Sequence, residues 1–184
     1  MKQAHELAAN LLQESLPRRW AHTQGVAACA RRLAVAVEGE ASLLEAAAVL
    51  HDIGYAPPLV ATGFHPLDGA RYLRDAQVID SRVVRLVANH SFALLEAEER
   101  HLHTELASEF PLLDDTLLVD ALVYCDMTTT PDGESATSEE RVAEILCRYG
   151  ADSVVGRFIR RAAPEIHASV ARVRAAADAA GVML

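Results

Sequence analysis

Four helix-forming segments each carry one histidine or aspartate where the apolar pattern calls for a buried side chain. Residues three, four and seven apart share one face of a helix. By this spacing the four polar residues lie in line with apolar neighbours, on the faces expected to be buried. The sets are His22 with Val26, Cys29 and Leu33; His51 with Leu44, Ala47 and Ala48; His90 with Val83, Leu86 and Val87; and Asp126 with Val119, Leu122 and Val123.

A shared metal ion would account for all four residues. A single histidine on such a face is usually a core residue with one hydrogen bond. A buried carboxylate is harder to accommodate, because an unpaired charge is costly to remove from water. Imidazole and carboxylate ligands together suit Mn, Fe, Co, Ni or Zn, and the absence of nearby thiolates disfavours a structural zinc site. We therefore predict a catalytic type of site for a divalent transition metal.

The composition favours packed helices over sheets. The 184 residues are 51% hydrophobic and 5% aromatic, and much of the apolar content is alanine and leucine. A chain of this length forms one domain of ordinary size with a full core. We predict an all-α fold with a single domain over residues 1–184.

Local signals place the helices. Ser42 and Glu45 are predicted to form a capping box for the third helix, and Gly54 to stop it. The stretch 54–64 is rich in Gly and Pro and is predicted to be a loop. Asp80 and either Asp114 or Asp115 are predicted caps. The expected helices cover about 3–15, 17–37, 43–53, 65–76 and 81–90, two short pieces within 92–110, then 116–128, 139–149 and 153–180.

The net charge and the cysteines limit the kinds of ligand and cellular environment that we expect for this protein. The formal net charge of −9 argues against binding of a nucleic acid polymer, so a phosphate ligand should be small. Cys29, Cys125 and Cys147 lack a CxxC pairing and are predicted to be reduced, buried thiols. No apolar run is long enough to cross a bilayer, and we expect a cytoplasmic protein without membrane contact. The sequence leaves the oligomeric state undetermined, and a homodimer is an alternative because the Ala-rich helices could bury a dimer face.

The order of the polar residues resembles a known signature. His22, then the pair His51-Asp52, then Asp126 is similar to the H…HD…D pattern of the HD superfamily of metal-dependent phosphohydrolases, and "HDIG" at 51–54 is a frequent form of its central motif. The resemblance spans about residues 18–130 and implies an HD-type helical bundle on which the C-terminal helices, 139–180, pack. It also implies that these four residues hold a first metal ion.

Two further segments extend the resemblance to dinuclear members. "FHPLDGARYL" at 64–73 and "VANHS" at 87–91 are similar to segments of dinuclear HD enzymes, including bacterial HD-domain hydrolases of diadenosine tetraphosphate. The resemblance implies that Asp52 bridges to a second ion held by His65 and His90. Whether one or two ions bind stays open.

The function implied is hydrolysis of a small nucleotide-like phosphate ester or phosphoanhydride by a metal-bound hydroxide. His51 and Asp52 would act as catalytic metal ligands. Arg18 and Arg19 lie near His22 on the helix and are candidates to bind a substrate phosphate.

Other residues are weaker candidates. Tyr55 follows HDIG and could stack on a base or donate its hydroxyl. Asp68 is either a general acid or a carboxylate favoured by a helix N-terminus, and Arg71 is a weaker phosphate-binding candidate. Four histidines without supporting spacing are predicted to lie at the surface, namely His5, His101, His103 and His167.

Departures from related sequences bear on the substrate. Many HDIG proteins, including cyclic di-GMP phosphodiesterases, continue with Lys where this chain has Tyr55. The acidic pair of guanosine-tetraphosphate hydrolases is not evident, and the deoxynucleotide triphosphohydrolases are much longer. Two alternatives remain: a cyclic-nucleotide phosphodiesterase, and a non-catalytic regulatory HD module that binds a nucleotide.

Overall fold

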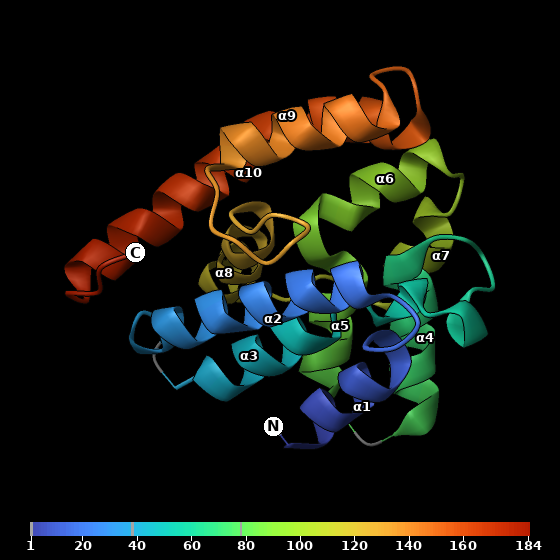
Figure 1. Cartoon of the computed structure of the whole chain (residues 1–184), viewed down its shortest axis with the longest axis horizontal. Helices are drawn as coiled ribbons and strands as arrows, with labels where there is room; N and C mark the ends of the chain where they lie inside the picture. Colours follow the sequence, from blue (N-terminus) through green and yellow to red (C-terminus); the bar gives the residue numbers. More distant parts are fainter. Residues whose placement is uncertain (1, 38, 78) are drawn as a thin grey trace.

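The fold is all-α, as the composition predicts. A computed structural model describes residues 2–37, 39–77 and 79–184, and within these ranges it contains helices but no strand, apart from an isolated bridge between Thr129 and Ser135 (Figure 1). The α-helices are α1 (Lys2–Leu12), α2 (Pro17–Arg32), α3 (Ala41–Leu50), α4 (His65–Ala76), α5 (Ser81–Asn89), α6 (Ala93–Glu99), α7 (His103–Glu109), α8 (Thr116–Met127), α9 (Ser138–Tyr149) and α10 (Val154–Ala179). Short 3-10 turns cover Leu33–Val35, Ile53–Tyr55, Pro57–Leu59 and His90–Phe92.

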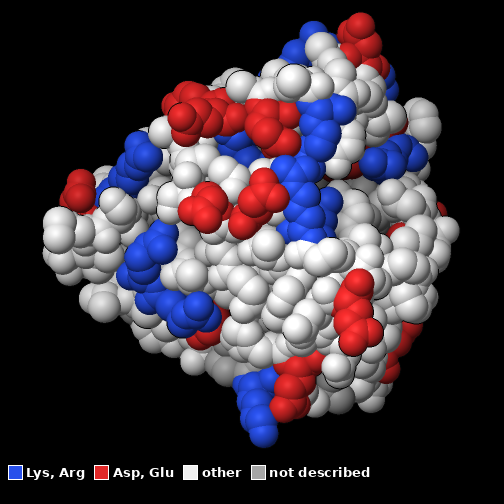
Figure 2. Space-filling model, viewed as in Figure 1, with Lys and Arg blue, Asp and Glu red and all other residues white. Residues whose placement is uncertain are grey.

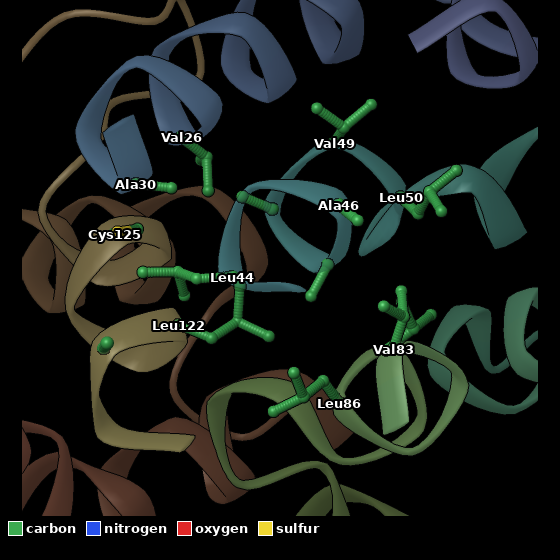
Figure 3. Close-up of a cluster of buried hydrophobic side chains, with 14 of the residues drawn as sticks. Val26, Ala30, Leu44, Ala46, Val49, Leu50, Val83, Leu86, Leu122 and Cys125 are labelled. Carbon is green, nitrogen blue, oxygen red and sulfur yellow. The ribbon is translucent and has the colours of Figure 1, made fainter. Parts of the chain in front are cut away.

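Helix α3 forms the centre of the main core. Its apolar residues are buried around almost the whole circumference, and α2, α5 and α8 surround it (Figure 3). The three consecutive alanines Ala46–Ala48 are buried and leave room for these helices to approach closely. Since His51 and Asp52 follow directly after this helix, the core anchors the segment that carries both residues.

The two C-terminal helices form a second layer. Helices α9 and α10 run side by side along one edge of the molecule, and α10 also packs on α8 (Figure 1). A smaller apolar cluster joins them to α8 through Val123, Met127, Ile145, Phe158 and Ile159. This layer places α9 and α10 beside the end of α8 that carries Asp126.

Several helix boundaries differ from the predictions. Ser42 does not cap α3, which begins at Ala41 with Glu40 at its N-cap and no side-chain cap. The carboxylate of Glu45 instead accepts hydrogen bonds from Arg31 and from the ring of His5, so a long-range contact replaces the predicted capping box. Helix α3 ends at Leu50, three residues earlier than predicted, and the predicted loop 54–64 contains short 3-10 turns.

Other local signals are confirmed. The side chain of Asp80 accepts a hydrogen bond from the amide of Arg82 and caps α5, and Asp115 caps α8 in the same way through Leu118. His65 begins α4 with Pro66 in the first turn, as predicted. The segment after His90 forms two short helices, α6 and α7.

Two surface predictions need correction. Cys29 and Cys125 are buried, but Cys147 is exposed, because it lies on the outward side of α9. His101 and His103 are exposed, whereas His5 and His167 are half-buried and hydrogen-bonded to Glu45 and Ser138.

Over the described ranges no helix combines the length and hydrophobicity that a bilayer span requires.

Candidate metal centre

Six side chains from different parts of the chain converge at one place. His22 and Asp126 lie within α2 and α8, and His65 is the first residue of α4. His51 and His90 lie directly after α3 and α5 rather than on a helical face, which differs from the prediction. Five of the six are buried, and His65 is nearly so, with 14% of its side chain exposed. Their convergence brings together every metal ligand predicted from the sequence.

The nitrogen and oxygen atoms fall into two groups that share Asp52. One group contains His22, His51 and Asp52, the other contains Asp52, His65 and His90, and within each group one potential ligand atom per residue lies within 4.8 Å of the others. The carboxylate of Asp126 adjoins the first group, with Oδ1 3.1 Å from Nε2 of His22 and 4.0 Å from Nε2 of His51.

Three of the imidazoles are held by backbone carbonyls. Nδ1 of His22 lies 3.0 Å from the carbonyl oxygen of Thr130, that of His51 lies 2.8 Å from Ala48, and that of His90 lies 2.6 Å from Val87. A carbonyl only accepts, so each Nδ1 must carry the proton and donate it. In the neutral form of each ring, which a metal ion would require, Nε2 then presents its lone pair to the centre, an arrangement typical of metal-binding histidines.

Gly54 of the HDIG segment lets α4 approach the centre. A Cβ at this position would lie 2.0 Å from the carbonyl oxygen of His65 and 2.7 Å from the amide nitrogen of Gly69. Only a residue without a side chain permits backbone contact this close. The prediction that Gly54 ends the helix is wrong, since α3 already ends at Leu50; Gly54 instead lets α4 bring His65 close to Asp52, with Nε2 3.4 Å from Oδ1.

The backbone after His90 has an unusual conformation. Ser91 and Phe92 have φ of 49° and 63°, a left-handed conformation that side chains other than glycine rarely adopt. Strain of this kind often occurs at functional sites. Here it directs the Ser91 hydroxyl to donate to Oδ2 of Asp126. Nothing in the sequence predicted this role for Ser91.

The two buried carboxylates make the centre strongly attractive to positive charge. Burial opposes ionisation of Asp52, yet Arg19 and His51 hold its pKa well below the usual value. The pKa of Asp126 is likewise lowered against burial, chiefly by His22 and His51. Burial lowers the pKa of His51, but these carboxylates outweigh it and raise that pKa to about 9.

The donor set fits a divalent ion. His65 and His90 keep lowered pKa values, chiefly because of burial, which favours the neutral, ligating form of the ring. Nε2 of His51 is buried, lies 3.3 Å from Oδ2 of Asp52 and makes no well-aligned hydrogen bond in the described chain, so it can serve as a ligand together with that carboxylate. Neutral imidazoles beside carboxylates are the ligands that transition metals of the Mn to Zn series accept.

The two arginines predicted to bind phosphate, Arg18 and Arg19, differ in their distance from the centre. Nη1 of Arg19 donates to Oδ2 of Asp52 at 2.8 Å, and its guanidinium lies 3.9 Å from the centroid of the Tyr55 ring. Tyr55 in turn stacks on His65 with ring centroids 4.0 Å apart. Arg18 is mostly exposed and forms a two-pronged ion pair with Asp132. Arg19 and Tyr55 thus adjoin the centre, whereas Arg18 lies farther out.

Asp68 and Arg71 have other partners. The buried carboxylate of Asp68 accepts hydrogen bonds from the amides of residues 61–63 and from the Thr62 hydroxyl, so it organises the loop before α4. Arg71 pairs with Glu109. Neither residue lines the cleft over the centre.

A cleft opens beside the centre. It has a volume of about 80 Å³, and Asp52, His65, His90 and Asp126 are among the residues that line it. Helices α9 and α10 supply much of the remainder, a mixed wall of apolar and charged residues. These helices contribute Arg141, Ile145, Arg148, Phe158 and Ile159, and α6 contributes Glu96.

The polar members of this wall were missed by sequence reasoning. Arg141 and Arg148 have the spacing of one helical face, which is the available signal, but such charges usually mark a solvated surface. A second hollow, lined in part by Arg18, Arg19 and Arg148, reaches His22 from another side.

The fold and the centre together define a class, helical proteins in which histidines and aspartates from several helices form a buried candidate metal site. The family model described as HD domain matches residues 19–152, so the chain belongs to the HD domain family. This confirms the resemblance to the HD superfamily, though not to a particular subtype, and indicates a metal-dependent phosphohydrolase in general terms. No curated protein and no solved structure matches the chain.

Proposed function

We propose that the protein hydrolyses a phosphate ester or phosphoanhydride of a small nucleotide-like molecule with the help of two divalent ions. The observation that carries the proposal is the pair of ligand groups sharing Asp52, which lines the cleft together with His65 and His90. A carboxylate shared by two sets of histidines suits two neighbouring ions, as in two-metal hydrolysis.

The residues divide into two sets around Asp52. One ion would be held by His22, His51, Asp52 and Asp126, and the other by Asp52, His65 and His90. When bound, such ions activate water and neutralise charge on the phosphoryl group. The carbonyl hydrogen bonds of the histidines keep their lone pairs directed to the centre before substrate arrives.

Arg19 and Tyr55 would assist at the rim of the centre. Arg19 keeps Asp52 ionised and in place, and its remaining N–H groups are available to a phosphate oxygen. Burial, together with the nearby Asp52, raises the pKa of Tyr55, so its phenol stays neutral and can donate a hydrogen bond. The stack of Arg19, Tyr55 and His65 limits the rotation of all three side chains.

The direct test combines metal analysis with a substrate screen. Protein purified without chelator should contain Mn, Fe, Co, Ni or Zn, and should release phosphate from at least one class among nucleotides, dinucleotides and phosphate monoesters. A protein that holds metal and binds nucleotides without turning any over would support the regulatory alternative. Absence of both metal and turnover after reconstitution with each ion would refute the proposal.

His90→Ala should remove the second ion first. This histidine belongs only to the group Asp52, His65 and His90, so the variant should lose about one ion per chain while the other ion remains. Metal stoichiometry by elemental analysis measures the effect, with His103→Ala, an exposed histidine, as the control. An unchanged stoichiometry would contradict the two-ion proposal.

Glu96 is the candidate to protonate the leaving group. It is 6% exposed, lines the cleft, and accepts a hydrogen bond from Nε of Arg100 at 2.8 Å. Burial raises its pKa even though Arg100 acts in the opposite direction, so the carboxyl keeps its proton to a higher pH than an exposed glutamate does. Asp68, the candidate from the sequence, is instead committed to loop amides.

Glu96→Gln should slow substrates according to their leaving group. Turnover of an alkyl phosphate should fall by roughly 10²-fold, because general acid catalysis is lost. Turnover of p-nitrophenyl phosphate should change far less, because its leaving group needs no proton. The glutamine can still accept from Arg100, and Glu105→Gln on the exposed side of α7 is the control. Equal losses for both substrates would exclude the proton-donor role.

A further inference from the structure

We propose that the substrate carries a second anionic group, a phosphate or a carboxylate, which binds between Arg141 and Arg148 of α9. The inference rests on the proposed function, because it assumes that the scissile phosphate lies at the metal ligands. It adds a requirement on the substrate that the metal centre does not impose.

The two arginines face the same cleft as the centre. They lie seven residues apart on α9, and residues at this spacing share a helical face. Both line the cleft that is also lined by Asp52, His65 and His90. Figure 2 shows Arg side chains gathered with Asp and Glu side chains over α9 and the start of α2. The cationic pair is therefore part of the substrate-accessible cleft.

The positive charge of the pair is only half compensated. Nη1 of Arg141 and Nη2 of Arg148 both donate to the same oxygen of Glu144, Oε2. One carboxylate thus serves two guanidinium groups.

The neighbouring acids are engaged by other residues. Glu96 is hydrogen-bonded to Arg100, and Asp132 forms its two-pronged pair with Arg18, although the charge of Asp132 also interacts with Arg148. Asp52 and Asp126 are surrounded by Arg19 and the histidines. An anion in the cleft would supply the missing negative charge.

Arg141 has an unsatisfied donor in a buried position. Its side chain is only 6% exposed, and Nε has no hydrogen-bond partner in the described part of the chain. Leaving a buried N–H of a charged group without an acceptor is costly. The guanidinium fork matches a phosphate or carboxylate, which accepts two parallel hydrogen bonds. A bound oxyanion would therefore satisfy both the charge and the orphaned donor.

The apolar residues around the two arginines indicate what lies between the two anionic groups of the substrate. Ile145 lies between the two arginines on α9, and Phe158 and Ile159 of α10 line the same cleft. These apolar side chains favour a compact organic body over a hydrated sugar chain. The substrate class is thus a phosphate compound with an apolar body and two separated anionic groups.

Calorimetric binding to the metal-loaded protein tests the inference independently of turnover. Adenosine 3′,5′-bisphosphate should bind at least about 10-fold more tightly than adenosine 5′-monophosphate, the usual contribution of a hydrogen bond to a charged group. In a second arm, 4-carboxyphenyl phosphate is compared with phenyl phosphate. Preference in the first arm alone indicates a phosphate as the second anion, and preference in the second arm alone indicates a carboxylate.

Substitutions locate the preference. Arg141→Met should weaken binding of the preferred ligand with two anionic groups roughly 10- to 100-fold. The affinity for the matched ligand with one anionic group should remain nearly unchanged. Arg148→Met, at a more exposed position, should show the same selectivity and provides the test if Arg141→Met fails to fold. The control Arg160→Met removes an exposed arginine of α10 outside the cleft, and should alter binding by less than about threefold.

The outcomes separate this inference from the proposed function. Turnover without any preference in either arm, or equal weakening of both ligands by Arg141→Met and Arg148→Met, overturns the second-anion site and leaves the hydrolase intact. Selective binding that depends on these arginines supports the site, even where no turnover is found and the hydrolase proposal fails.

Discussion

Asp52→Ala is expected to lose metal binding and to reduce phosphate release by on the order of 10³-fold or more, because a metal ion contributes several kcal/mol of transition-state stabilisation. Asp52 is the one residue common to both ligand groups, so its removal weakens both proposed ions at once. Its loss also leaves Arg19 without its carboxylate partner. Elemental analysis and a phosphate-release assay measure the two effects.

Controls separate loss of the ligand from loss of the fold. Asp52→Asn keeps the size of the side chain but removes the charge, and should show the same metal loss with a cooperative thermal transition. Asp114→Ala, at an exposed aspartate, should retain metal and activity. Full turnover by a folded Asp52→Ala protein would refute the assignment of this residue.

Gly54→Ala should have the largest effect on stability. The added methyl group would lie 2.0 Å from the His65 carbonyl oxygen and 2.7 Å from the amide of Gly69, so α4 must move away. We expect a loss of about 3 kcal/mol or more in the free energy of unfolding, at the upper end for overpacked sites. Because His65 is the first residue of α4, the same movement should weaken metal binding at the group Asp52, His65 and His90.

Gly39→Ala provides the matched control for that variant. Gly39 has a φ of 87° but no atom within 4 Å of the position of a Cβ. The substitution should cost about 1 kcal/mol through backbone strain and should leave metal binding unchanged. Chemical denaturation and metal titration of both variants provide the comparison. If Gly54→Ala were no less stable than Gly39→Ala, the close approach of α4 would not matter.

Local sequence signals predicted much of the fold. Asp80 and Asp115 cap their helices because a cap depends on hydrogen bonds two or three residues away. Ser42 and Glu45 follow the capping-box pattern equally well, yet Glu45 bonds to His5 and Arg31 from other helices. A capping prediction fails where a distant partner competes for the same carboxylate.

Four residues of the centre were predictable because they interrupt an apolar helical pattern, whereas Asp52 and His65 were indicated by the resemblance to HD enzymes. Polar side chains such as His22 and Asp126 on apolar faces indicate a shared partner, and the structure brings them together. The wall of the cleft had no comparable signal. Arg141 occurs on a helix rich in charge, where exposure is the usual outcome, and only the packing of α9 and α10 buries it.

The helical class, the approximate positions of the helices and four candidate ligands could be inferred from the chain's local patterns, because periodicity and residue chemistry are local properties, and the motif resemblance added Asp52 and His65. Which other residues meet them depends on the packing of distant segments. The closeness of Gly54 to α4, the left-handed Ser91 beside Asp126, and the pairing of Arg141 and Arg148 with one Glu144 all depend on how distant segments pack. Those contacts are set by the free energy of the whole packed chain, which no local pattern records.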